Sequence, residues 1–391
     1  MPTNLSGNKG EWSEIYIFLK LMNDGKIYAA DKDMKKIATV YLNIIKIIRE
    51  EFPSQTYEYF TGDPIKICLN GSDAGPDVPL TQIEAMKNEL WELFQTAGRG
   101  NFSSEHIEDF LSSIHIFKLK APATSKAEFF GGTQDIIMSV MDYRNGITST
   151  VGFSCKSDFS HKSTLFNASK DNTNFRYKLT GMTDELMERV NNTFNIKQKL
   201  NKETGLKETK YEIAISDRIS LMKNSGVDIH FDKAVVDNAT RNLILSGGTE
   251  MPKIVGAMLL NYYWNNNAET AHSSIVEATQ YIITSNSADY NFDGLESIYK
   301  RKIGNLLYDM FTGMRLSKEW DGRSSVNGGY IVAKDDGDVL AYHSCIADEF
   351  KDFLVEKLGF EAPSSSRHNA IQVYKIEDEY FINFNLQVRF K

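Results

Sequence analysis

The chain has few cysteines and no long apolar segment, and both absences restrict its class. Its three cysteines, Cys68, Cys155 and Cys345, lie far apart, and none belongs to a Cys-x-x-Cys pair. A disulfide framework and a zinc site are therefore not expected, and the pattern indicates a reducing cytoplasm. The longest apolar stretch, residues 254–263, is too short to cross a membrane, and the start has no signal-peptide pattern. We expect a cytoplasmic globular protein with no membrane partner.

Positive charge is outnumbered by negative charge over the whole chain, but not in one region. The 391 residues, enough for two domains, have a formal net charge of −8. Residues 151–210 are the exception, because they hold 11 basic and 7 acidic side chains. Such a stretch suits a polyanionic partner. The lysines of residues 197–210 form either part of that surface or an ordinary solvated helix face.

The hydrophobic pattern predicts an α/β chain of the α+β type, in which helices and strands alternate in blocks. Residues 41–49 fit either a strand or a helix. Asn145-Gly146 separates two β-rich runs, residues 134–141 and 147–157, which is a strong signal for a hairpin. The expected helices cover residues 15–22, 83–94, 107–114, 253–264, 273–284, 294–313 and 349–357, and two further hairpins pair 330–334 with 339–343 and 371–376 with 380–390.

The first hairpin brings an acid and an amine together. If Asn145 and Gly146 alone form the turn, Asp135 lies opposite Lys156; if the pairing slides by two residues, it lies opposite Ser154. In both registers the three side chains share one face of the hairpin, because strand side chains alternate. A carboxylate and an ammonium side by side are costly to bury unless they are paired or functional.

These residue types suit metal-assisted hydrolysis of a phosphodiester. A carboxylate such as Asp135 can anchor Mg²⁺, for which Mn²⁺ can substitute, and Lys156 can stabilise charge on the phosphate. Glu14, near the start of the first predicted helix, is the candidate for a second carboxylate, and Glu11 could share its face. Both glutamates could equally be solvated acids favoured by the helix dipole. Asp142, just before the turn, is a turn residue or an alternative ligand.

Four blocks of the chain, residues 7–33, 152–175, 320–343 and 363–391, resemble the HpaII family of type II restriction endonucleases. The resemblance implies a PD-(D/E)XK nuclease core in residues 1–180 and an additional α+β DNA-recognition region in residues 181–391. It also implies that Asp135 and Lys156 are the motif's Asp and Lys, that Ser154 replaces its second acid, and that Glu14 is the helix acid. Asp135 and Glu14 would then hold the metal.

The resemblance further implies cleavage of double-stranded DNA at a short site, CCGG or a variant of it. A cognate methyltransferase would act in the same system, and a palindromic site favours a homodimer. A catalytically decayed DNA-binding protein and a repair nuclease without sequence preference are the alternatives. Candidate DNA contacts, chosen for their hydroxyl, amide and cationic side chains, are Ser163, Asn167, Ser169, Asn172, Asn174, Arg323, Arg367 and His368. Residues 163–175 could instead be an Asn-rich surface loop, and His368 a structural histidine.

Overall fold

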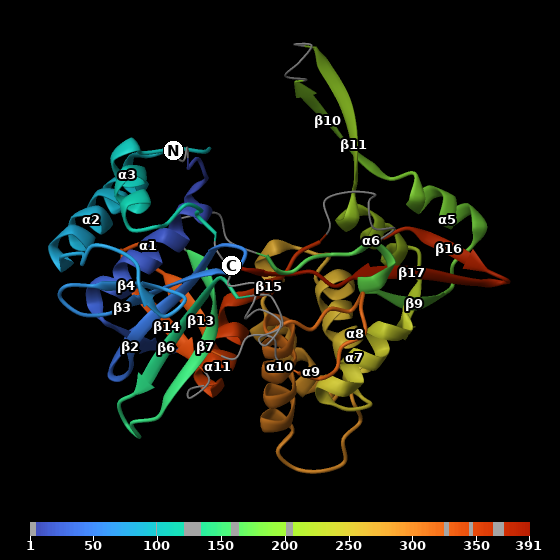
Figure 1. Cartoon of the computed structure of the whole chain (residues 1–391). Coiled ribbons are helices and arrows are strands. Elements are labelled where there is room, and N and C mark those ends of the chain that lie inside the picture. Colours follow the sequence, from blue (N-terminus) through green and yellow to red (C-terminus); the bar gives the residue numbers. More distant parts are fainter. Residues whose placement is uncertain are drawn as a thin grey trace. The chain divides into compact units, whose positions relative to one another are not determined.

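The computed structural model describes residues 5–98, 100–120, 134–157, 164–200, 206–323, 328–343, 347–362 and 371–391. The chain divides into two compact units. Unit 1 is Met1–Lys162 with Ser324–Phe353, and unit 2 is Ser163–Arg323 with Leu354–Lys391 (Figure 1). The division expected near residue 180 is therefore earlier in the chain. A second correction is that the predicted 330–343 hairpin belongs to the first unit, because its strands pair with strands of that unit's sheet.

Unit 1 is built on a nine-stranded mixed sheet with the order β1-β14-β13-β7-β6-β2-β3-β4-β5. Pairing is parallel between β13 and β7 and between β1 and β14, and antiparallel between the other neighbours. The strands are β1 (Lys26–Ala30), β2 (Lys36–Phe52), β3 (Gln55–Phe60), β4 (Lys66–Leu69), β5 (Ser72–Asp73), β6 (Ile136–Asp142), β7 (Thr148–Ser157), β13 (Gly329–Ala333) and β14 (Val339–His343).

Helix α1 (Lys9–Asp24) packs on one face of this sheet. Its apolar positions, such as Ile15, Phe18 and Met22, recur every three or four residues and are buried in one core with Phe153 and Cys155 of β7. Helices α2 (Leu80–Thr96) and α3 (Glu105–Ser113) add residues to the same core. Helix α11 (Ala347–Lys357) packs against the tyrosines of β13 and β14.

The described residues of unit 2 form three small sheets and a group of helices. The sheets have the orders β12-β9-β17-β16, β15-β18-β8 and β10-β11. Their strands are β8 (Thr164–Phe166), β9 (Asn174–Thr180), β10 (Phe194–Leu200), β11 (Lys207–Ile213), β12 (Asp228–Ala234), β15 (Leu358–Phe360), β16 (Val373–Ile376), β17 (Glu379–Asn385) and β18 (Val388–Phe390). The helices are α5 (Asp184–Asn191), α6 (Ile215–Asn224), α7 (Asp237–Gly247), α8 (Met251–Leu260), α9 (Ile275–Ser285) and α10 (Leu295–Phe311), with a π-helical turn at Asn261–Asn265.

Most of the expected elements are present; one open alternative is resolved and two expectations are corrected. Residues 41–49 belong to the long strand β2. Residues 197–210 contribute to two strands of a hairpin and not to a helix face. The last hairpin ends at Asn385, because β18 leaves it and pairs with β15 and β8. Among the described residues no single helix is long and apolar enough to cross a membrane. Helix α7 and the segment Met251–Asn265 have the necessary length and apolar content only together, and they are bent by 106° relative to each other.

Candidate active site

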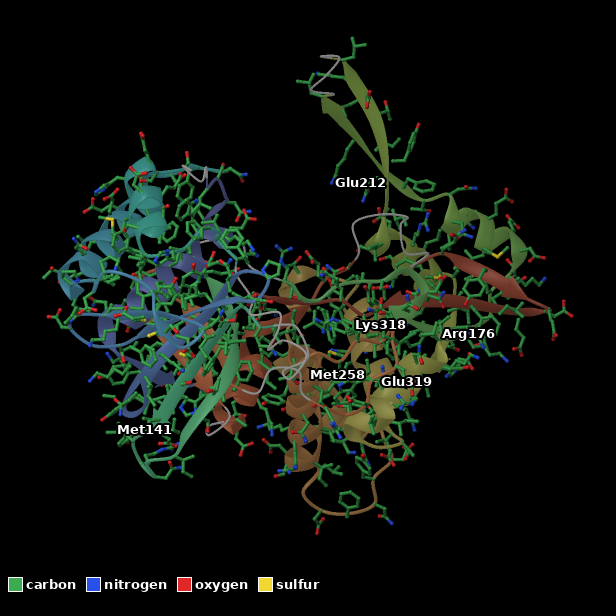
Figure 2. All side chains as sticks on the ribbon, in the orientation of Figure 1. Met141, Arg176, Glu212, Met258, Lys318 and Glu319 are labelled. Atoms are coloured by element: carbon green, nitrogen blue, oxygen red, sulfur yellow. The ribbon has the colours of Figure 1, made fainter. Side chains whose placement is uncertain are left out.

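The hairpin of β6 and β7 carries the candidate site at its open end, and Met141 lies near its closed end (Figure 2). Ile136 pairs with Phe153, and the amide of Asp135 donates to the Phe153 carbonyl at 2.9 Å. Asp135 therefore lies opposite Ser154 and not opposite Lys156. Of the two registers that the sequence allowed, the structure has the one shifted by two residues.

A four-residue loop is the cause of that shift. Asp142 donates its amide to the Ile147 carbonyl, and its own carbonyl accepts from the amide of Gly146 at 2.8 Å, so the loop covers residues 143–146. Gly146 has a φ of 69°, which favours glycine. The Asp142 carboxylate accepts from the guanidinium of Arg144 at 3.0 and 2.8 Å. Asp142 is therefore the last residue of β6 and closes the loop, which is the turn role that the sequence favoured over that of a ligand.

Two donors from β7 hold the carboxylate of Asp135. Its Oδ2 accepts from the Ser154 hydroxyl at 2.9 Å and from the Cys155 amide at 2.7 Å. Gly152 allows Gln134, the residue before Asp135, to lie close to β7, since a Cβ at Gly152 would come within 2.3 Å of the Gln134 side chain. Ser154 supplies no charge to replace a second acid, but it orients the acid that is present.

Glu14 lies near Asp135. Its side chain is only 12% exposed, and its Oε1 lies 3.1 Å from Nζ of Lys120. Burial, and then the negative charge of Asp135, raise the pKa of Glu14 to about 7, although Lys120 and Arg49 oppose the shift. The structure thus brings the helix acid and the hairpin acid into one electrostatic environment, as the sequence predicted.

Lys156 lies two residues beyond Ser154 on the continuous strand β7, and strand alternation places both side chains on the same face. It pairs with Val332 of β13, so it lies inside the sheet and not at its edge. Burial raises the pKa of the neighbouring Cys155 thiol well above its usual value, and the charge of Lys156 opposes that rise. Lys156 itself is half-buried, on the same side of the hairpin as Asp135 and Ser154.

Lys120 is the residue at this site that sequence reasoning missed. The segment that leads to it is held by Arg49, whose Nη2 donates to the Lys118 carbonyl at 2.6 Å. Glu51 completes the attachment, because it accepts from Nε of Arg49 at 2.7 Å and from the Phe117 amide at 2.9 Å. No sequence pattern links these residues to Glu14, since only the tertiary fold brings them together.

Glu11 caps helix α1, and its negative charge also contributes to the raised pKa of the site residue Lys120. Its Oε2 accepts from the Asn8 amide at 2.9 Å, and the Asn8 side chain accepts from the Glu11 amide. This reciprocal pair is a capping box, which satisfies two amides at the start of α1.

The candidate DNA contacts differ in accessibility. Asn167 is exposed, whereas Ser169 and Asn172 are half-buried. Nδ2 of Asn172 donates a hydrogen bond to Oγ of Ser169 at 3.1 Å. Asn174 is 0% exposed, and its Oδ1 accepts a hydrogen bond from Nδ2 of the Asn385 side chain at 2.7 Å. Its selection as a DNA contact was therefore wrong, because it belongs to the core of unit 2. Arg323 is exposed, and Ser163, Arg367 and His368 lie outside the described residues.

The acidic content of the site is limited. Within the described part of the chain, no group of three or more His, Cys, Asp and Glu side chains is arranged to hold a metal ion. Glu14 and Asp135 are the pair of carboxylates that the structure brings together here. A divalent ion at this position would have two protein carboxylates near it.

Comparison with known proteins places this chain in a family. The family model of the HpaII restriction endonuclease matches residues 8–390. The type II restriction enzyme HpaII of Haemophilus parainfluenzae is 33% identical to this chain over the full length of both proteins. No solved structure gives a significant match. The chain therefore belongs to the HpaII restriction endonuclease family and is a site-specific deoxyribonuclease.

Proposed function

We propose that the enzyme cuts double-stranded DNA at CCGG, or at a variant of it, by Mg²⁺-dependent hydrolysis at a PD-(D/E)XK-type site. The observation that carries the proposal is the oriented carboxylate of Asp135, held by Ser154 and Cys155 beside the buried Glu14. Lys156 follows on the same strand, so the order Asp, Ser-x-Lys lies on two neighbouring antiparallel strands. That arrangement is the one the family resemblance implies, with serine in the position of the second acid.

The donor set fits Mg²⁺, with Mn²⁺ as a substitute. Carboxylate oxygens are the ligands that these ions prefer, and Mg²⁺ usually keeps several waters while it binds one or two carboxylates and the substrate phosphate. Two carboxylates are therefore sufficient. The mutual repulsion of Glu14 and Asp135, which contributes to the raised pKa of Glu14, would be relieved by a divalent cation. A bound Mg²⁺ would polarise the phosphate and acidify an attacking water.

Each residue of the candidate site has a distinct role in the proposed reaction. Ser154 and the Cys155 amide fix the direction of the Asp135 carboxylate. Glu14 supplies the second carboxylate from α1, where Lys120 neutralises part of its charge. The ammonium of Lys156 orients the attacking water and stabilises negative charge on the phosphate during hydrolysis.

The wider assignment follows from the family. Unit 1 would be the nuclease core, and unit 2 would hold most of the DNA-reading residues, with Asn167 and Arg323 as accessible candidates. We propose further that the enzyme works in the cytoplasm beside a cognate methyltransferase, and that a homodimer cuts both strands of a symmetric site.

Digestion of phage DNA with the purified enzyme tests the proposal. In Mg²⁺ we expect fragments whose sequenced ends share one short motif and carry 5′-phosphates. Ends without a shared motif would indicate a nuclease without sequence preference. Uncut DNA that is still bound specifically would indicate a decayed enzyme.

A further inference from the structure

The hairpin of β10 and β11 stands apart from the other sheets of unit 2. Its register runs without interruption from Phe194 opposite Ile213 to Leu200 opposite Lys207. In Figures 1 and 2 it projects away from the helices and sheets of its unit, with Glu212 near its base. A two-stranded hairpin has little stability of its own in water.

The base of this hairpin is firmly attached. Arg218 of α6 is buried and donates to the carbonyls of Asn191, Thr193 and Ile371. The same guanidinium lies 5.0 Å from the centre of the Phe194 ring, at the start of β10. The projecting strands are therefore held in a defined direction relative to the rest of unit 2.

One face of the hairpin is apolar and exposed. Ile196 and Tyr211 lie opposite each other and are 66% and 64% exposed. Phe194 and Leu200 share their face by strand alternation, and Leu206, just before β11, is 68% exposed. An exposed apolar group of this kind marks a binding surface.

Charge indicates what the surface binds. The two strands contain four lysines and two glutamates, in a chain whose net charge is −8. The Lys197 side chain is 63% exposed, and its Nζ lies 2.6 Å from Oε2 of Glu212 on the neighbouring strand. The two strands therefore carry an excess of positive charge in an acidic chain, and this excess favours a polyanion as the partner. The same hairpin of a second copy would add more lysines instead.

We propose that the β10–β11 hairpin is a DNA-binding arm that lies in a groove of the duplex. The major groove is about 12 Å wide and admits a two-stranded ribbon. The apolar face, which Lys207 shares, would lie against base edges and sugars, and the long side chains of Lys207 and of Lys197 on the opposite face would reach the phosphates of the groove walls. This inference rests on DNA being the substrate and not on the proposed catalytic residues.

Binding of a fluorescent duplex, measured by anisotropy across a KCl titration in EDTA, tests the arm. Lys197→Ala with Lys207→Ala should weaken binding and lower the slope of log affinity against log salt by about 2, since each phosphate contact contributes about 0.9. Ile196→Ser with Tyr211→Ser should weaken binding about tenfold or more at every salt concentration and leave the slope unchanged, because these groups displace no counterions.

Two exposed lysines on helices of the same unit provide the matched control. Lys253→Ala with Lys300→Ala should leave both affinity and slope unchanged. Wild-type affinity and slope in both hairpin variants would overturn the proposal. A hairpin variant that alters the sedimentation coefficient of the free protein, with DNA binding intact, would overturn it in favour of a second copy as the partner. Gel analysis of the same samples reports cleavage separately, so a failure of the metal-dependent mechanism would be seen independently.

Discussion

Replacing Glu14 with glutamine should stabilise the folded enzyme at neutral and alkaline pH. Glu14 is buried beside Asp135, and these two causes raise its pKa to about 7 from its ordinary value of 4.5. In its ionised form the side chain is therefore less stable in the folded chain than in the unfolded one. Glutamine has nearly the same shape and carries no charge, so it removes this cost.

The size and sign of the effect follow from the two pKa values. Below pH 4.5 Glu14 is protonated in both states, and it imposes no electrostatic penalty. As the pH rises, the unfolded chain loses this proton first, and the free energy of unfolding falls until the folded pKa, about 7, is passed. A shift of one pKa unit corresponds to about 1.4 kcal/mol, so the full loss is about 3 kcal/mol.

Thermal unfolding of both proteins in EDTA, from pH 5 to pH 8.5, measures this difference. For a unit of this size 1 kcal/mol moves the Tm by about 2–4 °C. The advantage of Glu14→Gln should grow from pH 5 to pH 7 and then level off. Lys120→Met, which removes the ammonium 3.1 Å from Glu14, should do the opposite and lower the Tm most at high pH. Parallel curves for wild type and Glu14→Gln would refute the buried-acid account.

Three further predictions concern the metal and the core of unit 2. Mg²⁺ or Mn²⁺ should support cleavage and EDTA should stop it, while Ca²⁺ should permit binding with little turnover; full activity in EDTA would count against oxygen-ligated metal catalysis. Raising Mn²⁺ should partly restore cleavage by Glu14→Gln but not by Lys156→Ala, and identical titrations for the two variants would show that Glu14 is not a ligand. Asn174→Ala should lower the free energy of unfolding by about 1–3 kcal/mol, because the Asn385 side-chain NH₂ group loses this acceptor, with unchanged specific DNA affinity; a stable variant with weakened binding would reverse that assignment.

The hairpin of the site could be predicted from sequence because its key property survives an error in register. A shift of two residues changes which residue lies opposite Asp135, but it leaves Asp135, Ser154 and Lys156 on one face. The shift itself was not predictable from Asn145-Gly146, since the loop is extended by the Asp142–Arg144 interaction. Local signals favour the shortest turn.

Other features depend on contacts between distant parts of the chain. Lys120 approaches Glu14 only because Arg49 and Glu51 hold the preceding segment. The return of residues 324–353 to unit 1 rests on parallel pairing of β13 with β7, for which the sequence has no local signal. The β10–β11 strands contain four lysines and two glutamates, and this charge is as typical of a solvated helix face as of a strand.

The central claim is that Lys156 acts in hydrolysis and not in binding. Single-turnover cleavage of a duplex containing the recognised site, in saturating Mg²⁺, tests it when the affinity of Lys156→Ala for the same duplex is measured in parallel. We predict a loss of rate of at least about a thousandfold, typical of removing such an electrostatic contribution, with specific binding retained. Cleavage by Lys156→Ala at a rate near that of the wild type would contradict the account.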